Sequence, residues 1–278
     1  MLVSGQRRAL FRKSLVVPTE HGSWSWLLVP WLVGTLIGLA SFARAPHAGL
    51  AVLLTLIGAL SAFMIRQPAT AWTRIRQGRG RQADKNLALG WVVLFAALAL
   101  GCLLGLLALQ RTALSALALP FLGVLAAYLL AARSGRATLR SLAMELVGAI
   151  GLALTAPAAL LAATNQVSRL ALTLWALFAL QNALGVLYVR LRLADTKQHT
   201  GDRQLTLLGH LAAFVATLLA GALGWIPLLA ATPFAGFLVR ALWAVRQSHP
   251  IADIKRFGFT EVGVELLGGA LIAASYLL

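Results

Sequence analysis

The most regular feature of this sequence is the alternation of long apolar runs with short polar segments. Each run has roughly 20 residues, the length that an α-helix needs to cross the hydrocarbon core of a bilayer. Nine runs can be counted, at about residues 22–40, 48–65, 87–109, 113–132, 141–163, 170–189, 204–224, 226–245 and 258–277. The seventh and eighth runs are separated only by Gly224, Trp225 and Pro227, and a single span there would leave eight. The pattern predicts an all-α integral membrane protein, with nine transmembrane helices in one domain, 1–278.

Basic residues orient these helices. All but three of the 24 Lys and Arg residues fall in every second polar segment, counted from the N-terminus, and the exceptions are Arg44, Arg111 and Arg169. Because Lys and Arg accumulate in cytoplasmic loops, we expect a cytoplasmic N-terminus and an external C-terminus. An eight-helix division would break the alternation. The eight acidic residues lie at or near the same side, so any chemistry is expected to face the cytoplasm.

Composition narrows the function classes further. The chain has 278 residues, of which 60% are hydrophobic and 12% charged, which excludes a soluble domain and a disordered chain. The single cysteine excludes an intramolecular disulfide and a cysteine-ligated metal site. The net charge of +16 follows from the basic loops, so we expect no nucleic-acid partner. No histidine spacing typical of metal ligands occurs. The sequence predicts no metal site and leaves the cofactor unknown.

The first candidate motif is P-T-E-H-G-S-W-S-W, residues 18–26. Pro18 and Thr19 suit a helix start, and tryptophans suit the membrane interface. Helix capping and anchoring would explain the whole motif. The alternative rests on the adjacent pair Glu20 and His21, which can hold or pass a proton near neutral pH.

The second candidate is Arg66, at the inner end of the second run. It follows Gly58 and Ala62 at spacings of four, and small residues permit close helix packing. We expect Pro68 to end or kink the helix. Arg66 would then either point into the bundle and bind an anion, or only anchor the helix end at the membrane surface.

The strongest functional signal lies in the sixth run and its exit. Five positions spaced by four, three, four and three share one helical face, namely Gln181, Gly185, Tyr188, Arg192 and Asp195. Asn182 borders this stripe, whereas Arg190 lies well off it. A polar stripe in a spanning helix should not face lipid. It should face either a structural hydrogen-bond network or a water-filled cavity.

Three carboxylates complete the candidates. Glu145 lies about one turn inside the fifth run, where it can pair with Arg140 or act as a catalytic or orienting group. Glu261 and Glu265 lie four residues apart on one face of the last run. They could meet Lys or Arg from inner loops in a structural role.

The stretch V-V-P-T-E-H-G-S-W-S-W-L-L-V-P-W-L-V-G at the first span resembles the start of the YwiC-like bacterial membrane proteins. The resemblance continues through I-R-Q-P at 65–68, M-E-L-V-G at 144–148, L-T-A-P-A at 154–158 and Y-V-R-L-R at 188–192. A more distant likeness is to the UbiA prenyltransferase superfamily, which implies nine helices, an internal N-terminus and a cytoplasm-facing cavity. That family holds Mg²⁺ with Asp-rich motifs. At the position of the first motif, this sequence reads R-Q-P-A-T-A-W-T-R-I-R and contains no Asp. No residue of this sequence is therefore assigned the role of that family's catalytic aspartates.

Arginine binds phosphate oxygens directly, without a metal. Our hypothesis is therefore a cytoplasm-facing polar cavity in which Arg66 and Arg192 hold an anionic isoprenoid or lipid. In this hypothesis the protein acts as a metal-independent transferase or as a binding protein. The expected proton-handling or catalytic residues are Glu20, His21 and Glu145. The expected substrate-binding residues are Arg66, Gln181, Asn182, Tyr188, Arg190, Arg192 and Asp195.

Two alternatives remain, a transporter of a small anion or lipid, and a non-catalytic membrane subunit. The expected location is the bacterial inner membrane. The expected partners are membrane lipids, with protein partners unknown.

Overall fold

The computed structural model describes residues 12–17, 21–41, 44–134 and 141–278, and these residues form helices without a β-strand. Eight helices are long and apolar enough to cross a membrane, and a shorter apolar segment covers Thr112–Tyr128. These nine segments correspond one to one with the nine predicted runs. The all-α, multi-pass prediction is thus confirmed for the described part of the chain.

The chain divides into two compact units, which we describe separately. The smaller unit comprises residues 1–21 and 53–110, and the larger comprises residues 22–52 and 111–278. The expectation of a single domain stays a prediction.

The smaller unit is built on a helical hairpin. Its helices are α1 (Lys13–Val16), most of α3 (Ala48–Arg76), the short 3₁₀ turn η1 (Gln82–Asp84) and α4 (Lys85–Ala108). A Cβ at Gly58 of α3 would lie 3.3 Å from the Cβ of Cys102 on α4, which shows how closely the two helices approach. At one end of the hairpin, both carboxylate oxygens of Asp84 accept hydrogen bonds of 2.9 Å from Arg12.

We expected Pro68 to end or kink the helix; the expected end is wrong, and a kink at Pro68 stays a prediction. The helix runs on to Arg76, and Pro68 lies inside it. A proline removes one backbone hydrogen bond, and in membrane proteins neighbouring groups commonly compensate for such a loss. Beyond Pro68, the buried side chain of Ile75 and the packing of Arg76 over the Trp72 ring favour continued helix.

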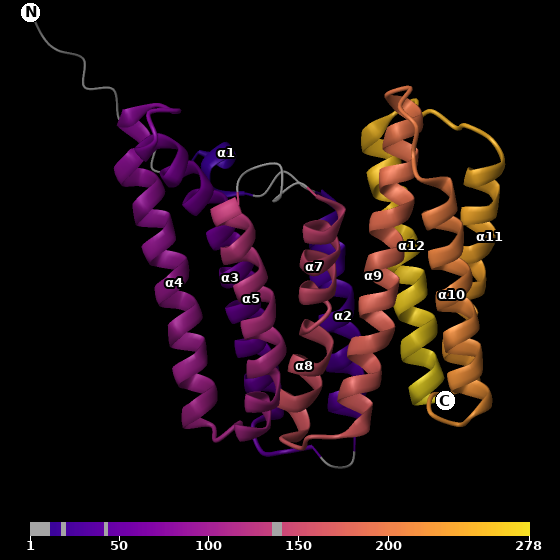
Figure 1. Ribbon diagram of the computed structural model, residues 1–278. Helices are drawn as coiled ribbons and strands as arrows, with labels where there is room; N and C mark the ends of the chain where they lie inside the picture. Colours follow the sequence, from indigo (N-terminus) through magenta and orange to yellow (C-terminus); the bar gives the residue numbers. More distant parts are fainter. Residues whose placement is uncertain (1–11, 18–20, 42–43, 135–140) are drawn as a thin grey trace, which may run out of the picture. The chain divides into compact units, whose positions relative to one another are not determined.

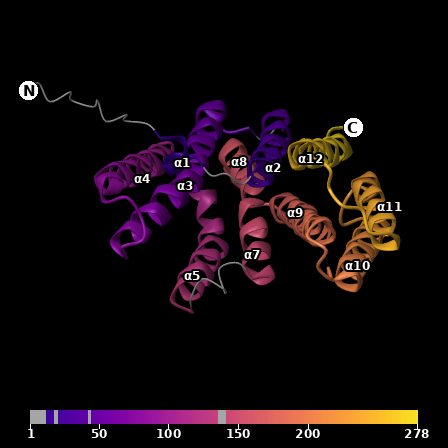
Figure 2. The ribbon, with the colours of Figure 1, turned by 90° about the horizontal axis from the view of Figure 1, so that it is seen from above.

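The larger unit contains the remaining helices. Their bounds are α2 (His21–Ala40), η2 (Thr112–Leu117), α5 (Ala118–Ser134), α7 (Leu142–Leu152), α8 (Thr155–Thr164), α9 (Arg169–Thr196), α10 (Arg203–Ala222), η3 (Leu228–Ala231), α11 (Thr232–Arg246) and α12 (Ile254–Leu277). Within this unit α9 packs against α7 and α8 on one side and against α10, α11 and α12 on the other (Figures 1 and 2). The helix is therefore the centre of the unit.

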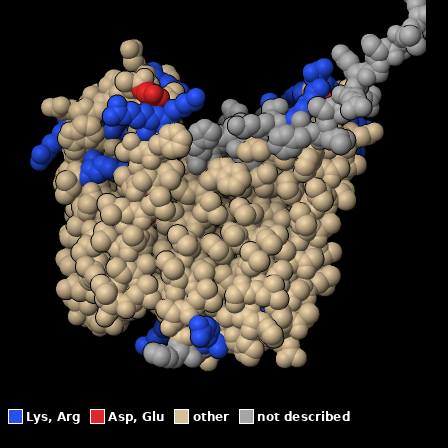
Figure 3. Space-filling view, turned by 180° about the vertical axis from the view of Figure 1, so that it is seen from behind, with Lys and Arg blue, Asp and Glu red and all other residues tan. Residues whose placement is uncertain are grey.

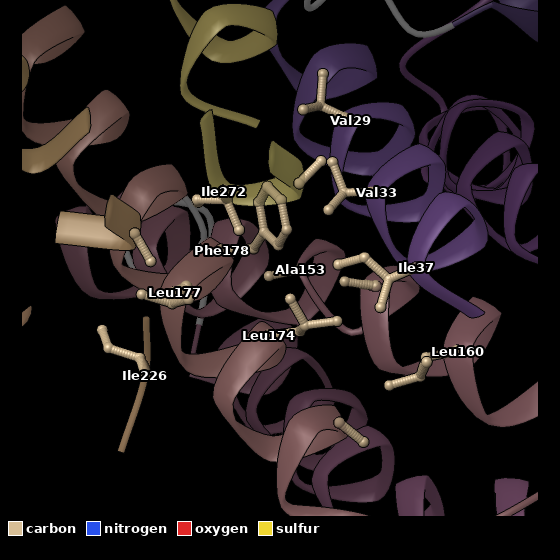
Figure 4. Close-up of a cluster of buried hydrophobic side chains, with 14 of the residues drawn as sticks. Val29, Val33, Ile37, Ala153, Leu160, Leu174, Leu177, Phe178, Ile226 and Ile272 are labelled. Carbon is tan, nitrogen blue, oxygen red and sulfur yellow. The ribbon is translucent and has the colours of Figure 1, made fainter. Parts of the chain in front are cut away.

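The apolar core of the larger unit surrounds Phe178, a fully buried side chain of α9. Figure 4 shows Phe178 beside Val33 of α2 and Ile272 of α12, with Leu177 just before it and Leu174 one turn before it on α9. Gly269 of α12 lets this helix approach α2, because a Cβ there would collide with Val29. The core thus joins α2, α9 and α12.

The fifth predicted run is one membrane segment but two helices. It breaks at Ala153 and Leu154, between α7 and α8. Pro157 explains the break, because its ring clashes with the carbonyl of the residue four positions earlier, which is Ala153. The Thr155 hydroxyl bridges the break by donating hydrogen bonds to Leu152 O (2.9 Å) and to Leu27 O of α2 (2.8 Å). A sequence pattern of apolar runs does not resolve such a break.

The backbones of α2 and α8 lie in direct contact. All residues of α8 except Ala158 are buried, and five of its ten are alanines, which permit close approach. A Cβ at Gly34 would overlap the carbonyl group of Ala156. Because that obstacle is backbone rather than a flexible side chain, it cannot move aside alone.

We therefore expect Gly34→Ala to destabilise the protein by about 2 kcal/mol or more, since overpacking a rigid contact forces helices apart. Gly236→Ala in α11 is the matched control, because a Cβ there meets nothing within 4 Å. Thermal unfolding in detergent micelles measures both variants. Equal stability of the two variants would show that α2 and α8 are not in backbone contact.

Candidate functional site

The polar stripe of α9 faces the interior of the larger unit. All five predicted positions, together with Asn182, are buried, whereas Arg190 is exposed. The predicted face of the helix is thus confirmed. Whether these residues bind a substrate stays a prediction, but their contacts show what they hold together.

Asn182 joins α9 to two other helices and is fully buried. Its Nδ2 donates to the carbonyl of Trp26 on α2 (3.1 Å) and to that of Ala149 on α7 (2.9 Å). The Trp26 carbonyl is the one that loses its helical partner, because Pro30, four residues later, lies inside α2 and has no N–H. Asn182 therefore satisfies a backbone group that the bilayer cannot hydrate.

Gln181 connects α9 to α12 through Glu265. The Gln181 Nε2 donates to the Glu265 backbone oxygen (3.0 Å) and to its carboxylate Oε2 (2.5 Å). The Trp26 indole of α2 donates a further hydrogen bond to the same carboxylate. Gly185 gives this carboxylate room, because a Cβ at that position would lie 3.1 Å from Glu265 Oε1. A carboxyl group thus lies between three helices.

One turn along α12, Glu261 forms an ion pair with Arg240 of α11. Both Glu261 oxygens accept from Arg240 Nη1, at 2.9 and 3.0 Å. The Arg240 guanidinium also lies 3.8 Å from the centroid of the Tyr188 ring. The predicted contact of Glu261 with a basic residue is confirmed, but its partner comes from a helix and not from a loop.

Arg192 is held among aromatic side chains. Its guanidinium lies between 5.2 and 5.7 Å from the ring centroids of Tyr188, Trp243 and Phe257. It donates to the Tyr188 hydroxyl (2.8 Å) and to the backbone oxygen of His249 (3.0 Å). In this structure Arg192 therefore links α9 to α11, to α12 and to the segment between them.

Asp195 ends the stripe, where α9 meets α10. Its carboxylate accepts from Arg203 Nη2 at 2.6 Å and from the backbone N–H of His249 at 3.3 Å. Arg203 also donates to the carbonyls of Ala244 and Val245 at the end of α11. The polar side chains of α9 thus make contacts with neighbouring helices at several levels from mid-helix to its C-terminal end.

A pocket lies on the other side of α9, beside Arg190. It has a volume of about 330 Å³. Its lining comes from α7, α9, α10 and the segment before α10, and comprises Leu142, Leu187, Arg190, Leu191, Ala194, Thr200, Gly201, Asp202, Leu205 and Thr206. Arg190 forms an ion pair of 2.9 Å with Glu145, and both side chains are about two-fifths exposed. Glu145 and Arg190 are therefore the predicted site residues that the fold brings to this pocket.

The other predicted residues lie elsewhere. Glu20 and Arg140 are outside the described residues, and His21 is described only as the first backbone position of α2. Arg66 is an exposed residue of α3 in the smaller unit. Their proposed roles stay predictions.

Arg240, Trp26 and Glu265 were not predicted as site residues. Arg240 was counted as a basic loop residue, although it lies well inside α11. Glu265 was placed near the inner surface, but α12 begins at Ile254 and so puts Glu265 midway along the helix. The sequence feature that indicates a buried polar site here is the pair of acidic residues Glu261 and Glu265, four positions apart in an otherwise apolar span.

On the face shown in Figure 3, Lys and Arg side chains gather towards the ends of the helices, and the surface between those ends is uncharged. This distribution agrees with membrane-spanning helices whose charged interior residues are covered. A model of the protein family described as YwiC-like protein matches residues 17–160, slightly more than half of the chain.

The chain belongs to the YwiC-like protein family. The resemblance of the first span to this family is thereby confirmed. No curated protein and no solved structure matches the chain. The matched residues of this YwiC-like protein end within α8, so the polar contacts of α9 to α12 lie beyond them.

The Arg240–Glu261 pair provides a test of the buried network. Glu261→Met should destabilise the protein by about 3 kcal/mol, because removing one partner leaves a largely buried charge without compensation. The double variant Arg240→Met, Glu261→Met should recover most of that loss, since buried pairs are often replaced by apolar residues without cost. Unfolding free energies in mixed micelles measure the double variant and both single variants, Arg240→Met and Glu261→Met. A double variant that loses as much as the sum of the two single variants would disprove the pairing.

Proposed function

We propose that this YwiC-like protein binds an anionic amphiphile in the pocket beside Arg190. The head group would contact Arg190, and the apolar chain would lie along Leu142, Leu187 and Leu205. The observation that carries the proposal is the composition of the pocket, which is lined by four leucines together with one arginine, two threonines and Asp202, whose carboxylate caps α10 by accepting from the Leu205 N–H. A volume of about 330 Å³ falls within the range of small-molecule sites.

The Glu145–Arg190 ion pair leaves room for a ligand. Because both side chains are about two-fifths exposed, the pair contributes little to stability, on the order of 0–1 kcal/mol. Arginine presents five donors, so a phosphate or carboxylate can bind Arg190 after displacing Glu145 or beside it. Glu145 then acts as a weak internal competitor for the anion.

As part of this proposal we assign the pocket to the cytoplasmic leaflet. Basic residues mark the polar segment that follows α9, as the positive-inside rule requires of a cytoplasmic loop. With nine spans, the proposal assigns the N-terminus to the inside and the C-terminus to the outside of a bacterial inner membrane. The resemblance to UbiA prenyltransferases makes a phosphorylated isoprenoid the first compound to test.

In this proposal the buried stripe supports the site without touching the ligand. Asn182, Gln181, Tyr188, Arg192 and Asp195 fix α9 from its inner face, and Arg190 projects from the opposite side. This replaces the initial hypothesis that Arg192 contacts the anion, because Arg192 is already bonded to Tyr188 and His249. Metal-independent binding is retained, since arginine needs no bridging cation.

Native mass spectrometry of the full-length protein in micelles tests the proposal, with farnesyl monophosphate and farnesol as probes. The wild type should bind the phosphate more tightly than the uncharged alcohol. Arg190→Ala should weaken phosphate binding about tenfold, because a charge-assisted hydrogen bond contributes about 1.5 kcal/mol or more. Arg246→Ala, which removes another exposed arginine of the same unit, should bind as the wild type does.

Glu145→Gln separates ligand binding from a merely structural ion pair. If Arg190 serves the anion, removing its competitor should leave phosphate binding equal or tighter, opposite in direction to Arg190→Ala. If binding falls in both variants alike, the ion pair only maintains the fold of the pocket. Equal affinity for phosphate and alcohol in the wild type would also contradict the proposal.

A further inference from the structure

The most unusual side chain of the larger unit is the carboxyl group of Glu265. It lies midway along the spanning helix α12, and the residue is only 5% exposed. Ionisable groups at that depth are costly, and they commonly mark proton or ion pathways in membrane proteins. The proposed binding pocket does not use this carboxyl, so it requires another explanation.

Among the residues that the structure describes, only neutral groups donate hydrogen bonds to it. The donors are the Gln181 amide of α9 and the Trp26 indole of α2. Among the described residues, no Lys or Arg nitrogen lies within ion-pair distance of Glu265. The charged groups that act on it from a distance are Arg240 of α11 and Glu261 of its own helix. The packed element η3 (Leu228–Ala231) contributes no titratable side chain.

Two glycines allow the side chains of Glu265 and Gln181 to fit between the helices. Glycine occurs at position 185 of α9, against the carboxylate, and at position 268 of α12, where a Cβ would lie 2.7 Å from Gln181 Oε1. That oxygen of Gln181 is buried and accepts no hydrogen bond from the described residues. An acceptor without a donor thus lies beside a carboxyl that is not in an ion pair.

A chain of polar contacts leads from this region to one end of the helices. Glu261, one turn from Glu265, pairs with Arg240, which lies over Tyr188. Tyr188 accepts from Arg192, and Arg192 donates to His249 O. The final contact joins the His249 N–H to Asp195, at the end of α9.

The opposite direction is apolar. From Glu265 towards the C-terminus, α12 continues as L-L-G-G-A-L-I-A-A. On α9, the buried side chains before Gln181 are Ala171, Leu174, Leu177 and Phe178. Among the described residues, polar contacts come within one turn of Glu265, at Glu261, from the end at which α9 terminates. In the opposite direction α12 makes its next side-chain hydrogen bond to another helix only at Tyr276, which donates to Thr173.

We propose that Glu265 is a proton-binding site within the membrane, and that it exchanges protons with the side on which α9 ends. The reaction is a simple protonation of the carboxylate and its reversal, and it needs no other reactant. Its consequence is electrostatic. The interior set of Arg192, Arg240, Glu261 and Glu265 is neutral when Glu265 is ionised and carries one positive charge when Glu265 binds a proton. Proton binding would therefore favour an anion in this part of the protein, independently of the pocket at Arg190.

Infrared spectroscopy of the full-length protein in liposomes tests this directly. Spectra are recorded from about pH 5 to about pH 9, the span over which buried carboxylic acids titrate. The wild type should show a carboxylic-acid C=O band that weakens as the pH rises. Glu265→Gln should lose this band, and Glu145→Gln, which removes an exposed carboxylate, should keep it.

A second measurement needs no variant. Dicyclohexylcarbodiimide reacts with protonated carboxylic acids in apolar surroundings and leaves a stable acylurea, which peptide mass spectrometry locates. The adduct should form on Glu265 of the wild type in liposomes, and less of it should form at high pH. The proposal is overturned if the wild type has no acid band that changes between these pH values, or if that band persists unchanged in a folded Glu265→Gln variant.

Discussion

Asn182 satisfies a carbonyl group that the protein cannot leave exposed within a bilayer. Pro30 deprives the Trp26 carbonyl of its helical partner, and lipid offers no hydrogen-bond donor to replace it. The side chain of Asn182 does so and also bonds to Ala149, so that α2, α7 and α9 are joined at one point. The neighbouring Gln181 binds Glu265 and adds α12 to the same assembly. Apolar helices gain no hydrophobic energy from meeting one another in lipid, so polar contacts and close packing decide their arrangement.

Because of this constraint, the two faces of α9 differ: one is buried and holds the helices together, and the other carries the exposed Arg190. The inner face carries buried side chains whose partners lie on α2, α7, α11 and α12, and it leaves them little freedom to rearrange around a ligand. Arg190 lies on the outer face, where its partner Glu145 is exposed and readily replaced. A rigid inner face and an accessible outer arginine form a suitable arrangement for binding at the end of a spanning helix. The carboxyl of Glu265 differs from both, because it is buried but bonded only to neutral donors.

The sequence allowed good prediction of features that depend on one segment alone. The nine apolar runs, the inward face of Gln181, Tyr188 and Arg192, and the outward position of Arg190 follow from length and helical periodicity. Features that depend on a distant partner could not be predicted. Nothing near Arg240 in the sequence indicates that it meets Glu261, and nothing near Asn182 indicates that it serves the carbonyl freed by Pro30. The effect of a proline could not be predicted for the same reason: α3 continues through Pro68, whereas Pro157 accompanies a break between α7 and α8.

A double-mutant cycle between Asn182 and Pro30 tests the central claim most directly. Asn182→Ala should destabilise the wild type by about 1–2 kcal/mol, because it leaves the Trp26 carbonyl unpaired in the membrane and removes a second donor from the Ala149 carbonyl, which also accepts from the Ala153 N–H. In a Pro30→Ala background the new backbone N–H can bond to the Trp26 carbonyl, so the same substitution should cost about 1 kcal/mol less. Unfolding free energies of the four proteins in mixed micelles give this difference. Strictly additive effects would contradict the account, because Asn182 and Pro30 would then not act on the same carbonyl.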